Sequence, residues 1–161
     1  MKPRIVEKSA FHVVGMQGRY TPTTNHGIPE LWSRFAPRMD EVEQRIGKHS
    51  FGVCIPIEGD ELGSFDYVAC VEVEPGGRVP EGMTALAVDG GTYAVFTHRG
   101  HISHFHETMK QVWGVWLPAS KLRYAHHPDF EYYDDRFDGT TGEGEVDIYV
   151  PIDPASTRVQ G

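Results

Sequence analysis

The sequence has no long apolar run, no cysteine motif and no excess of positive charge. No stretch approaches the roughly 18 consecutive apolar residues that a membrane-spanning helix needs. The 15 basic side chains are outnumbered by 23 acidic ones, and the net charge is −8. Neutralising phosphates requires a basic face, so direct nucleic-acid binding by this chain is not expected. We expect a protein that neither spans membranes nor contacts nucleic acid directly.

Cysteines are few, and a leader segment is not evident. Cys54 and Cys70 match no Cys-x-x-Cys spacing, so we expect both to be small buried residues in a reducing compartment. The N-terminus carries positive charge but lacks the apolar segment of a secretory signal. The chain is 161 residues long, which fits one domain, and a cytoplasmic location is expected.

Hydrophobic patterning predicts helices and strands in an order that occurs twice. Apolar residues at three- and four-residue steps indicate helices over 28–46, with a kink or break at Pro37, and over 103–117. Runs of β-forming residues between Gly and Pro turns indicate strands. The expected strands cover residues 4–17, 50–57, 65–74, 83–98 with a break at 89–91, 130–137 and 145–152.

The two expected helices carry similar motifs. The first contains WSRFAP starting at Trp32, and the second contains WGVWLP starting at Trp113. A strand–helix–strand–strand unit used twice predicts an α+β fold with pseudo-twofold symmetry, in which two main helices cover one face of an antiparallel sheet. Its halves would be about residues 1–82 and 83–152 of a single domain (1–152), followed by a tail over 153–161. Two units meet imperfectly at such an axis, so a central ligand cleft is expected there.

One acidic residue lies among aromatic ones in the segment HHPDFEYYDD at 126–135. On a strand, Glu131 and Tyr133 share one face, while Phe130 and Tyr132 share the other. A carboxylate among aromatic rings can accept a cationic or hydrogen-bonding ligand. Burial would raise its pKa and make it a candidate general base. The alternative is a solvent-facing glutamate on an edge strand.

Four other aromatic residues are candidates with a structural alternative. Trp113 and Trp116 could form the wall of a cleft, although aromatic residues at helical spacing are more often core. Tyr67 and Tyr149 could present hydroxyl groups to a ligand or serve as core tyrosines. The histidines between residues 98 and 106 accompany no HExxH motif and no paired cysteines, so we expect no metal site. No glycine-rich phosphate loop follows a strand, and no cofactor is expected.

Short segments with a particular order and spacing run along nearly the whole chain, from Pro3 to Ile152. They are VVG at 13–15, the Trp32 helix, FDY at 65–67 with VEV at 71–73, YAVFTHRG at 93–100, WGVWLP at 113–118, FEYY at 130–133 and DIYVPI at 147–152. In this order they resemble the GyrI-like small-molecule-binding domains, which are similar to the effector-binding domains of AraC-type and MerR-type multidrug regulators.

The resemblance implies two fused βαββ units and a ligand cleft. In that cleft a glutamate at the position of Glu131 would meet aromatic, often cationic compounds, and His98 would line the mouth. No helix-turn-helix precedes the first expected strand, so we expect a stand-alone member of the family.

Three functions are compatible with this resemblance. The first is capture of aromatic, often cationic small molecules, with Glu131 as the polar anchor. The second is a hydrolase that opens cyclopropane-bearing genotoxins by adding water, with Glu131 and Tyr133 acting on the water. The third is contact with a protein partner, since related proteins are named for restraining DNA gyrase.

Overall fold

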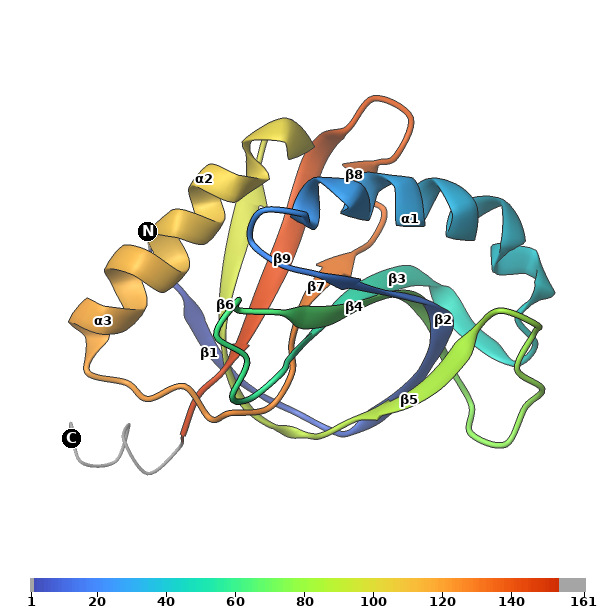
Figure 1. The fold of residues 1–161 in the computed structure, drawn as a ribbon, viewed down its shortest axis with the longest axis horizontal. Coiled ribbons are helices and arrows are strands. Elements are labelled where there is room, and N and C mark those ends of the chain that lie inside the picture. Colours follow the sequence, from blue (N-terminus) through green and yellow to red (C-terminus); the bar gives the residue numbers. More distant parts are fainter. Residues whose placement is uncertain (1, 154–161) are drawn as a thin grey trace.

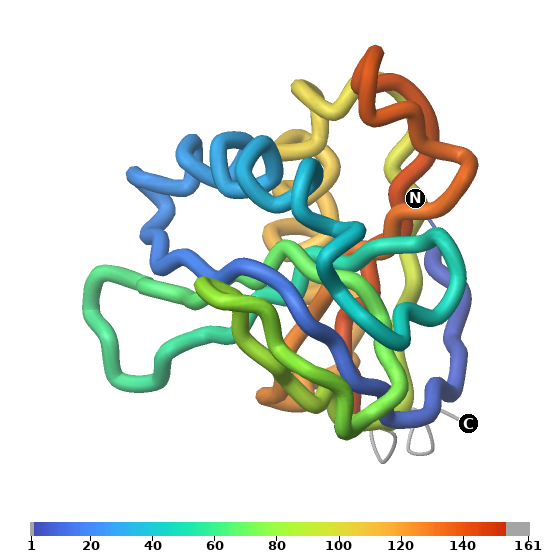
Figure 2. The backbone as a smooth tube through the Cα atoms, turned by 90° about the vertical axis from the view of Figure 1, so that its right-hand side faces the viewer, coloured from blue at the N-terminus to red at the C-terminus, as the bar shows by residue number. Residues whose placement is uncertain are grey.

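A computed structural model describes residues 2–153 of the chain (Figures 1 and 2). The strands are β1 (Arg4–Lys8), β2 (Phe11–Tyr20), β3 (Arg45–Pro56), β4 (Phe65–Val73), β5 (Thr84–Val88), β6 (Gly91–Arg99), β7 (Asp129–Tyr133), β8 (Phe137–Asp138) and β9 (Glu143–Pro151). The helices are η1 (Asn25–Gly27), α1 (Ile28–Phe35), η2 (Ala36–Glu41), η3 (Ile102–His104), α2 (Phe105–Lys110), the π-helical η4 (Gln111–Trp116) and α3 (Leu117–Ser120). Apart from Asp153, the expected tail lies outside the described residues.

The strands form one curled antiparallel sheet in the order β1-β6-β9-β7-β3-β4-β2-β5, with β8 paired to β9. Each half supplies a βαββ unit: β2-α1-β3-β4 in the first and β6-α2-β7-β9 in the second. The strand that precedes each unit pairs with the other unit: β1 pairs with β6 of the second unit, and β5 pairs with β2 of the first. The α+β fold with two βαββ units is therefore confirmed. The division of the chain at residue 82 stays a prediction.

The helices match the sequence pattern only in part. Residues 105–120 form one continuous helical stretch, as expected for 103–117. The first helix is shorter than predicted: α1 ends at Phe35 and continues as a 3-10 helix around Pro37, which has no N–H to donate. The expected last turn is wrong, because Ile46 already lies in β3.

Two predicted strands are wrong in extent. The segment 4–17 is two strands, since β1 pairs with β6 while β2 pairs with β4 and β5. The segment 130–137 is interrupted after Tyr133. Asp134 turns the chain there: its carboxylate accepts the Arg136 backbone N–H, and its carbonyl accepts the Phe137 N–H.

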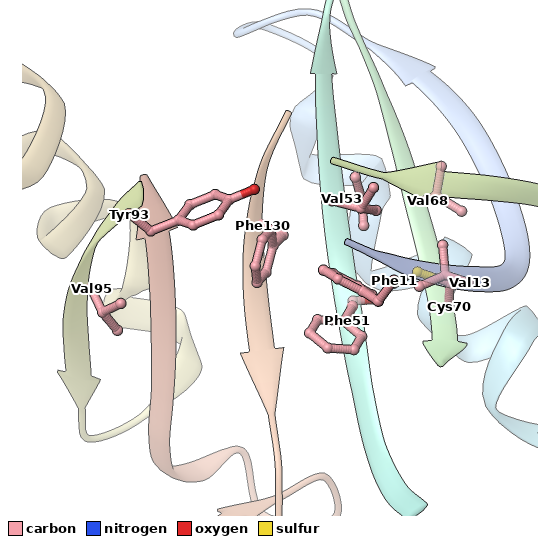
Figure 3. Close-up of a cluster of buried hydrophobic side chains, with 10 residues drawn as sticks. Phe11, Val13, Phe51, Val53, Val68, Cys70, Tyr93, Val95 and Phe130 are labelled. Carbon is pink, nitrogen blue, oxygen red and sulfur yellow. Dashed lines mark hydrogen bonds between the residues drawn. The ribbon is translucent and has the colours of Figure 1, made fainter. Parts of the chain in front are cut away.

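Hydrophobic clusters lie on both faces of the sheet. On the helix face, α1 packs on β2 and β4, and the α2–η4 stretch packs on β6 and β9. The central strands β7 and β3 thus lie between the regions that the two helices cover (Figure 1). The opposite face closes on itself in a core drawn from both halves (Figure 3), which includes Phe11, Val13, Phe51, Val53, Val68, Cys70, Val88, Tyr93, Val95 and Phe130.

Within residues 2–153, no helix combines the length and apolarity needed to cross a membrane.

Candidate functional site

Glu131 lies on β7, near the middle of the sheet and on its helix face. Its side chain accepts two phenol hydrogen bonds at Oε1, from Tyr67 Oη at 2.7 Å and from Tyr133 Oη at 2.8 Å. The Tyr67 hydroxyl in turn accepts the indole N–H of Trp32 at 2.9 Å. Glu131 is 9% exposed, so the carboxylate is buried and held by two neutral donors. The solvent-facing alternative for Glu131 is thereby excluded.

A glycine on the neighbouring strand makes this arrangement possible. Gly52 of β3 lies directly opposite Glu131 in the sheet. A Cβ at this position would lie 2.0 Å from Tyr67 Oη and 2.6 Å from Glu131 Oε1, closer than real Cβ contacts. The hydroxyl and the carboxylate therefore meet directly above a backbone that carries no side chain.

The electrostatics of Glu131 are dominated by burial. Loss of solvent raises the pKa of Glu131 to about 6, although the hydrogen bonds from Tyr67 and Tyr133 work in the opposite direction. The pKa of each of these phenols is raised well above its ordinary value, by burial and by the charge of Glu131. Both tyrosines therefore stay neutral hydrogen-bond donors at physiological pH.

A second carboxyl group, Asp129, shares this face of β7. Asp129 is 7% exposed, and burial followed by repulsion from Glu131 raises its pKa to about 7. Cys54 lies opposite Asp129 on β3, and burial together with the two carboxylates keeps the pKa of its thiol well above the usual value. Across residues 2–153, no salt bridge includes Asp129 or Glu131. The site therefore holds two buried acids without a basic partner.

Aromatic rings border Glu131 and the start of β7. On the α1 side, the rings of Trp32 and Tyr133 meet edge to face at 5.3 Å. On the α2 side, the ring of Trp113 lies 5.4 Å from that of Tyr124. The Tyr124 hydroxyl donates to the His127 carbonyl oxygen at 2.8 Å, two residues before Asp129 in the chain, and burial raises the pKa of this phenol. All four rings are half-buried.

The structure brings together three of the residues selected from sequence: Tyr67, Glu131 and Tyr133. Trp113 contacts Tyr124, whose hydroxyl binds the His127 carbonyl oxygen just before β7, while Trp116 packs on Phe96 at 4.8 Å between ring centroids.

His98 and Tyr149 are engaged elsewhere. His98 is 3% exposed, and its ring nitrogens lie 2.6 Å from Thr108 Oγ1 and 3.1 Å from the His101 carbonyl oxygen, which ties α2 to β6. Tyr149 pairs with Phe130 and stacks on its ring at 4.6 Å, on the face opposite Glu131. We therefore correct its placement: the β7–β9 register makes Tyr149 part of the core opposite the site. Within the described residues, no cluster of His, Cys, Asp or Glu is arranged to hold a metal ion.

Sequence reasoning missed two residues of the site. Trp32 enters the sequence argument as part of the repeated motif, and its equivalence to Trp113 is the signal that marks it as a candidate. Asp129 was missed because the strand was expected to begin at Phe130, whereas β7 begins one residue earlier. Alternation along β7 then places Asp129, Glu131 and Tyr133 on one face.

Neither Glu131 nor Asp129 lines the two hollows found in the described part of the chain. One of about 260 Å³ lies beside β2, β5 and the turn after β4, and another of about 570 Å³ lies beside residues 123–126. The expected central cleft stays a prediction, and the half-buried rings of Trp32 and Tyr133 border the Glu131 carboxylate in this form.

Comparison with known proteins gives the family. The model of the GyrI-like small molecule binding domain matches residues 1–153. The chain belongs to this family. The GyrI-like domain is thus a small-molecule-binding domain, in agreement with the resemblance deduced from its sequence.

Its relatives include regulators. The transcriptional regulator BrlR of Pseudomonas aeruginosa is 40% identical over 157 residues, covering 94% of this chain and 56% of BrlR. The probable transcriptional regulator YgiV of Escherichia coli is 35% identical over 75 residues, covering 44% of this chain and 45% of YgiV. The GyrI-like chain thus spans about half the length of the curated relatives it matches.

A solved structure supports the fold. SAV2435, described as bound to tetraphenylphosphonium, superposes with a TM-score of 0.80 at 17% identity and covers 99% of both chains. At this identity the likeness establishes the shared fold.

Proposed function

We propose that this domain binds aromatic cations, with Glu131 as the negative anchor and the rings of Trp32, Tyr67 and Tyr133 around it. The observation that carries the proposal is a buried carboxylate held by two neutral phenols and joined to no basic side chain in residues 2–153. The fold shared with SAV2435, which is described as bound to the aromatic cation tetraphenylphosphonium, supports the same ligand class.

The physical argument concerns the cost of an unpaired buried charge. A carboxylate removed from water without a counter-ion is unfavourable, and a cation placed beside it offsets that cost. The faces of Trp and Tyr rings attract cations and also cover flat apolar groups. A ligand that is both cationic and aromatic would satisfy the acid and the rings at once, whereas a neutral aromatic compound would satisfy only the rings.

Calorimetric titration of the full chain with tetraphenylphosphonium tests the proposal, with neutral triphenylphosphine oxide as the comparison ligand. We expect the cation to bind more tightly, and Glu131→Gln to weaken its binding by at least about tenfold, about 1.4 kcal/mol. The exposed Glu143 gives a matched control, and Glu143→Gln should leave the affinity unchanged. Equal affinity of wild type and Glu131→Gln for the cation would contradict the anchor assignment.

Binding should also depend on pH. Burial raises the pKa of Glu131 to about 6, so the carboxylate form that a cation needs is lost as pH falls through that value. We expect the affinity for tetraphenylphosphonium to fall from pH 8 to pH 5. In Glu131→Gln this dependence should be much reduced. A flat profile in the wild type would count against Glu131.

The same carboxylate supports a second candidate, the hydrolase that opens cyclopropane-bearing genotoxins. A group whose pKa is raised to about 6 can accept a proton from water near neutral pH, and Tyr133 lies within hydrogen-bond distance of it. Incubation with a cyclopropane-bearing DNA alkylator, followed by mass spectrometry, separates the two functions. A hydrated product that disappears in Glu131→Gln supports hydrolysis, while unchanged compound with quenched Trp fluorescence supports capture.

A further inference from the structure

The candidate site has two acidic centres, and a single cation anchored at Glu131 would use only one of them. Glu131 and Asp129 lie two residues apart on the same face of β7, which separates their backbone positions by about 6.7 Å. Both side chains are at least nine-tenths buried, and across the described residues neither takes part in a salt bridge.

The surroundings of the two acids follow the pseudo-twofold organisation of the fold. Glu131 is bordered by Trp32, from the helix of the first half, and by the phenols of Tyr67 and Tyr133. The Tyr124 hydroxyl donates to the carbonyl oxygen of His127, two residues before Asp129, and the Tyr124 ring contacts that of Trp113, from the helix of the second half. Trp32 and Trp113 each open the motif that occurs once in each half of the sequence. Each half of the domain therefore contributes a tryptophan: Trp32 on the Glu131 side, and Trp113 against Tyr124 beside the start of β7.

The two acids differ in how their oxygens are engaged. Glu131 Oε1 accepts two side-chain hydrogen bonds, whereas among residues 2–153 no side-chain donor to Asp129 is present. Asp129 accepts only a backbone N–H, its own, so its carboxyl oxygens keep acceptor capacity for a donor or cation brought by a ligand. Two like charges this close in a buried site disfavour each other, and a ligand with one positive centre offsets only one of them.

We propose that the site is built for aromatic dications, with Glu131 and Asp129 each facing one positive centre and the Trp32 and Trp113 sides covering the two ends of the ligand. The proposal rests on the proposed function, since it assigns a narrower ligand class to the same site. It predicts selectivity by charge number at constant shape, which a single anchor at Glu131 would not produce.

A matched pair of ligands tests the dication proposal. N,N′-dimethyl-4,4′-bipyridinium carries two positive nitrogens separated by about the same distance as the backbone positions of the two acids, and N-methyl-4-phenylpyridinium has the same shape with one charge. Calorimetric titration of the full chain at pH 8 should give at least about tenfold tighter binding of the dication. Asp129→Asn should remove that preference, so that the dication and the monocation bind within about twofold of each other.

Two controls keep the test decisive. Asp135→Asn removes one exposed carboxylate nearby and should preserve the preference, which separates the local effect from that of net charge. A thermal melt shows whether Asp129→Asn folds; if it does not, Asp129→Ser replaces it in the same titrations.

The outcomes separate this proposal from the one it rests on. Equal binding of the two ligands by the wild type, or a preference that survives in the folded Asp129 variant, overturns the dication proposal. If, in that case, the monocation binds and Glu131→Gln abolishes its binding, the proposal that Glu131 anchors aromatic cations still holds. If tetraphenylphosphonium and both pyridinium ligands fail to bind, both proposals fall.

Discussion

Glu131 weakens the fold that holds it, because burial disfavours its charged form. Its pKa is raised from 4.5 to about 6, so the folded chain holds the proton more tightly than the unfolded chain does. The stability that this proton contributes is complete below about pH 4.5 and is lost as pH rises through about 6. Above that pH, the charged side chain costs roughly 2 kcal/mol relative to a neutral one.

We therefore expect Glu131→Gln to raise the free energy of unfolding by roughly 2 kcal/mol at pH 8 and by almost nothing at pH 4. Urea denaturation at both values measures the difference, with Glu143→Gln as the exposed control. A variant no more stable than wild type at pH 8 would show that the hydrogen bonds of Tyr67 and Tyr133 outweigh burial.

For single residues, the sequence predicts which side chains share a face of a strand, but not which residues of two neighbouring strands are paired. The period of two placed Glu131 and Tyr133 on one face, and the structure agrees. The face of Tyr149 depends on its pairing with Phe130, which no local pattern encodes. Tyr67 could be selected as a candidate hydroxyl, but its hydrogen bond from Trp32 joins residues 35 positions apart and leaves no local sequence signal.

The second helix is anchored through a buried polar contact. The His98 ring on β6 lies 2.6 Å from Thr108 Oγ1 of α2, and its edge contacts Phe105. This contact gives His98 a structural role, and the ligand-lining role that the resemblance implies stays a prediction.

Thr108→Val keeps the shape of the side chain and leaves a buried ring nitrogen without its partner, so we expect a loss of about 1–3 kcal/mol in stability. Affinity for tetraphenylphosphonium should stay within about twofold of wild type. Thermal melts and calorimetry measure the two effects, and Thr84→Val on the edge strand β5 is the control. A loss of affinity as large as that of Glu131→Gln would show that the His98–Thr108 contact contributes to ligand binding.

The elements themselves were largely predictable, but their ends were not. Helical periodicity identified both helices, and turn residues separated most strands. The pattern could not show that α1 gives way to a 3-10 helix after Phe35, because the apolar spacing continues to Ile46. It also could not divide residues 4–17 into β1 and β2, since the division follows from their pairing with distant strands.

The whole molecule is held together by exchanged strands. β1 of the first half forms an edge beside β6, and β5, which leads into the second half, forms the other edge beside β2. The core in Figure 3 likewise combines Phe11 and Val13 with Tyr93 and Val95. Sequence repetition predicts two units but not this exchange, because local patterns do not specify long-range partners.

The exchange leads to a prediction about fragments. Residues 1–82 and 83–161 expressed separately should each lack a cooperative melt, because each lacks a strand of its sheet and half of the common core. Mixed together, they should regain a single cooperative transition and tetraphenylphosphonium binding. Circular dichroism melts and calorimetry of the separate and mixed fragments measure this. Cooperative folding of either fragment alone would refute the interdependence of the halves.

β7 divides two tasks between alternate positions of a single short segment. Asp129, Glu131 and Tyr133 face the helices, while Phe130 and Tyr132 pack toward the sealed interior of the curl. Evolution could therefore exchange the odd-numbered side chains to suit new compounds while the even-numbered ones continue to hold the scaffold. The ligand preference of the domain can thus change through substitutions on one face of this strand, while the packing on its other face stays the same.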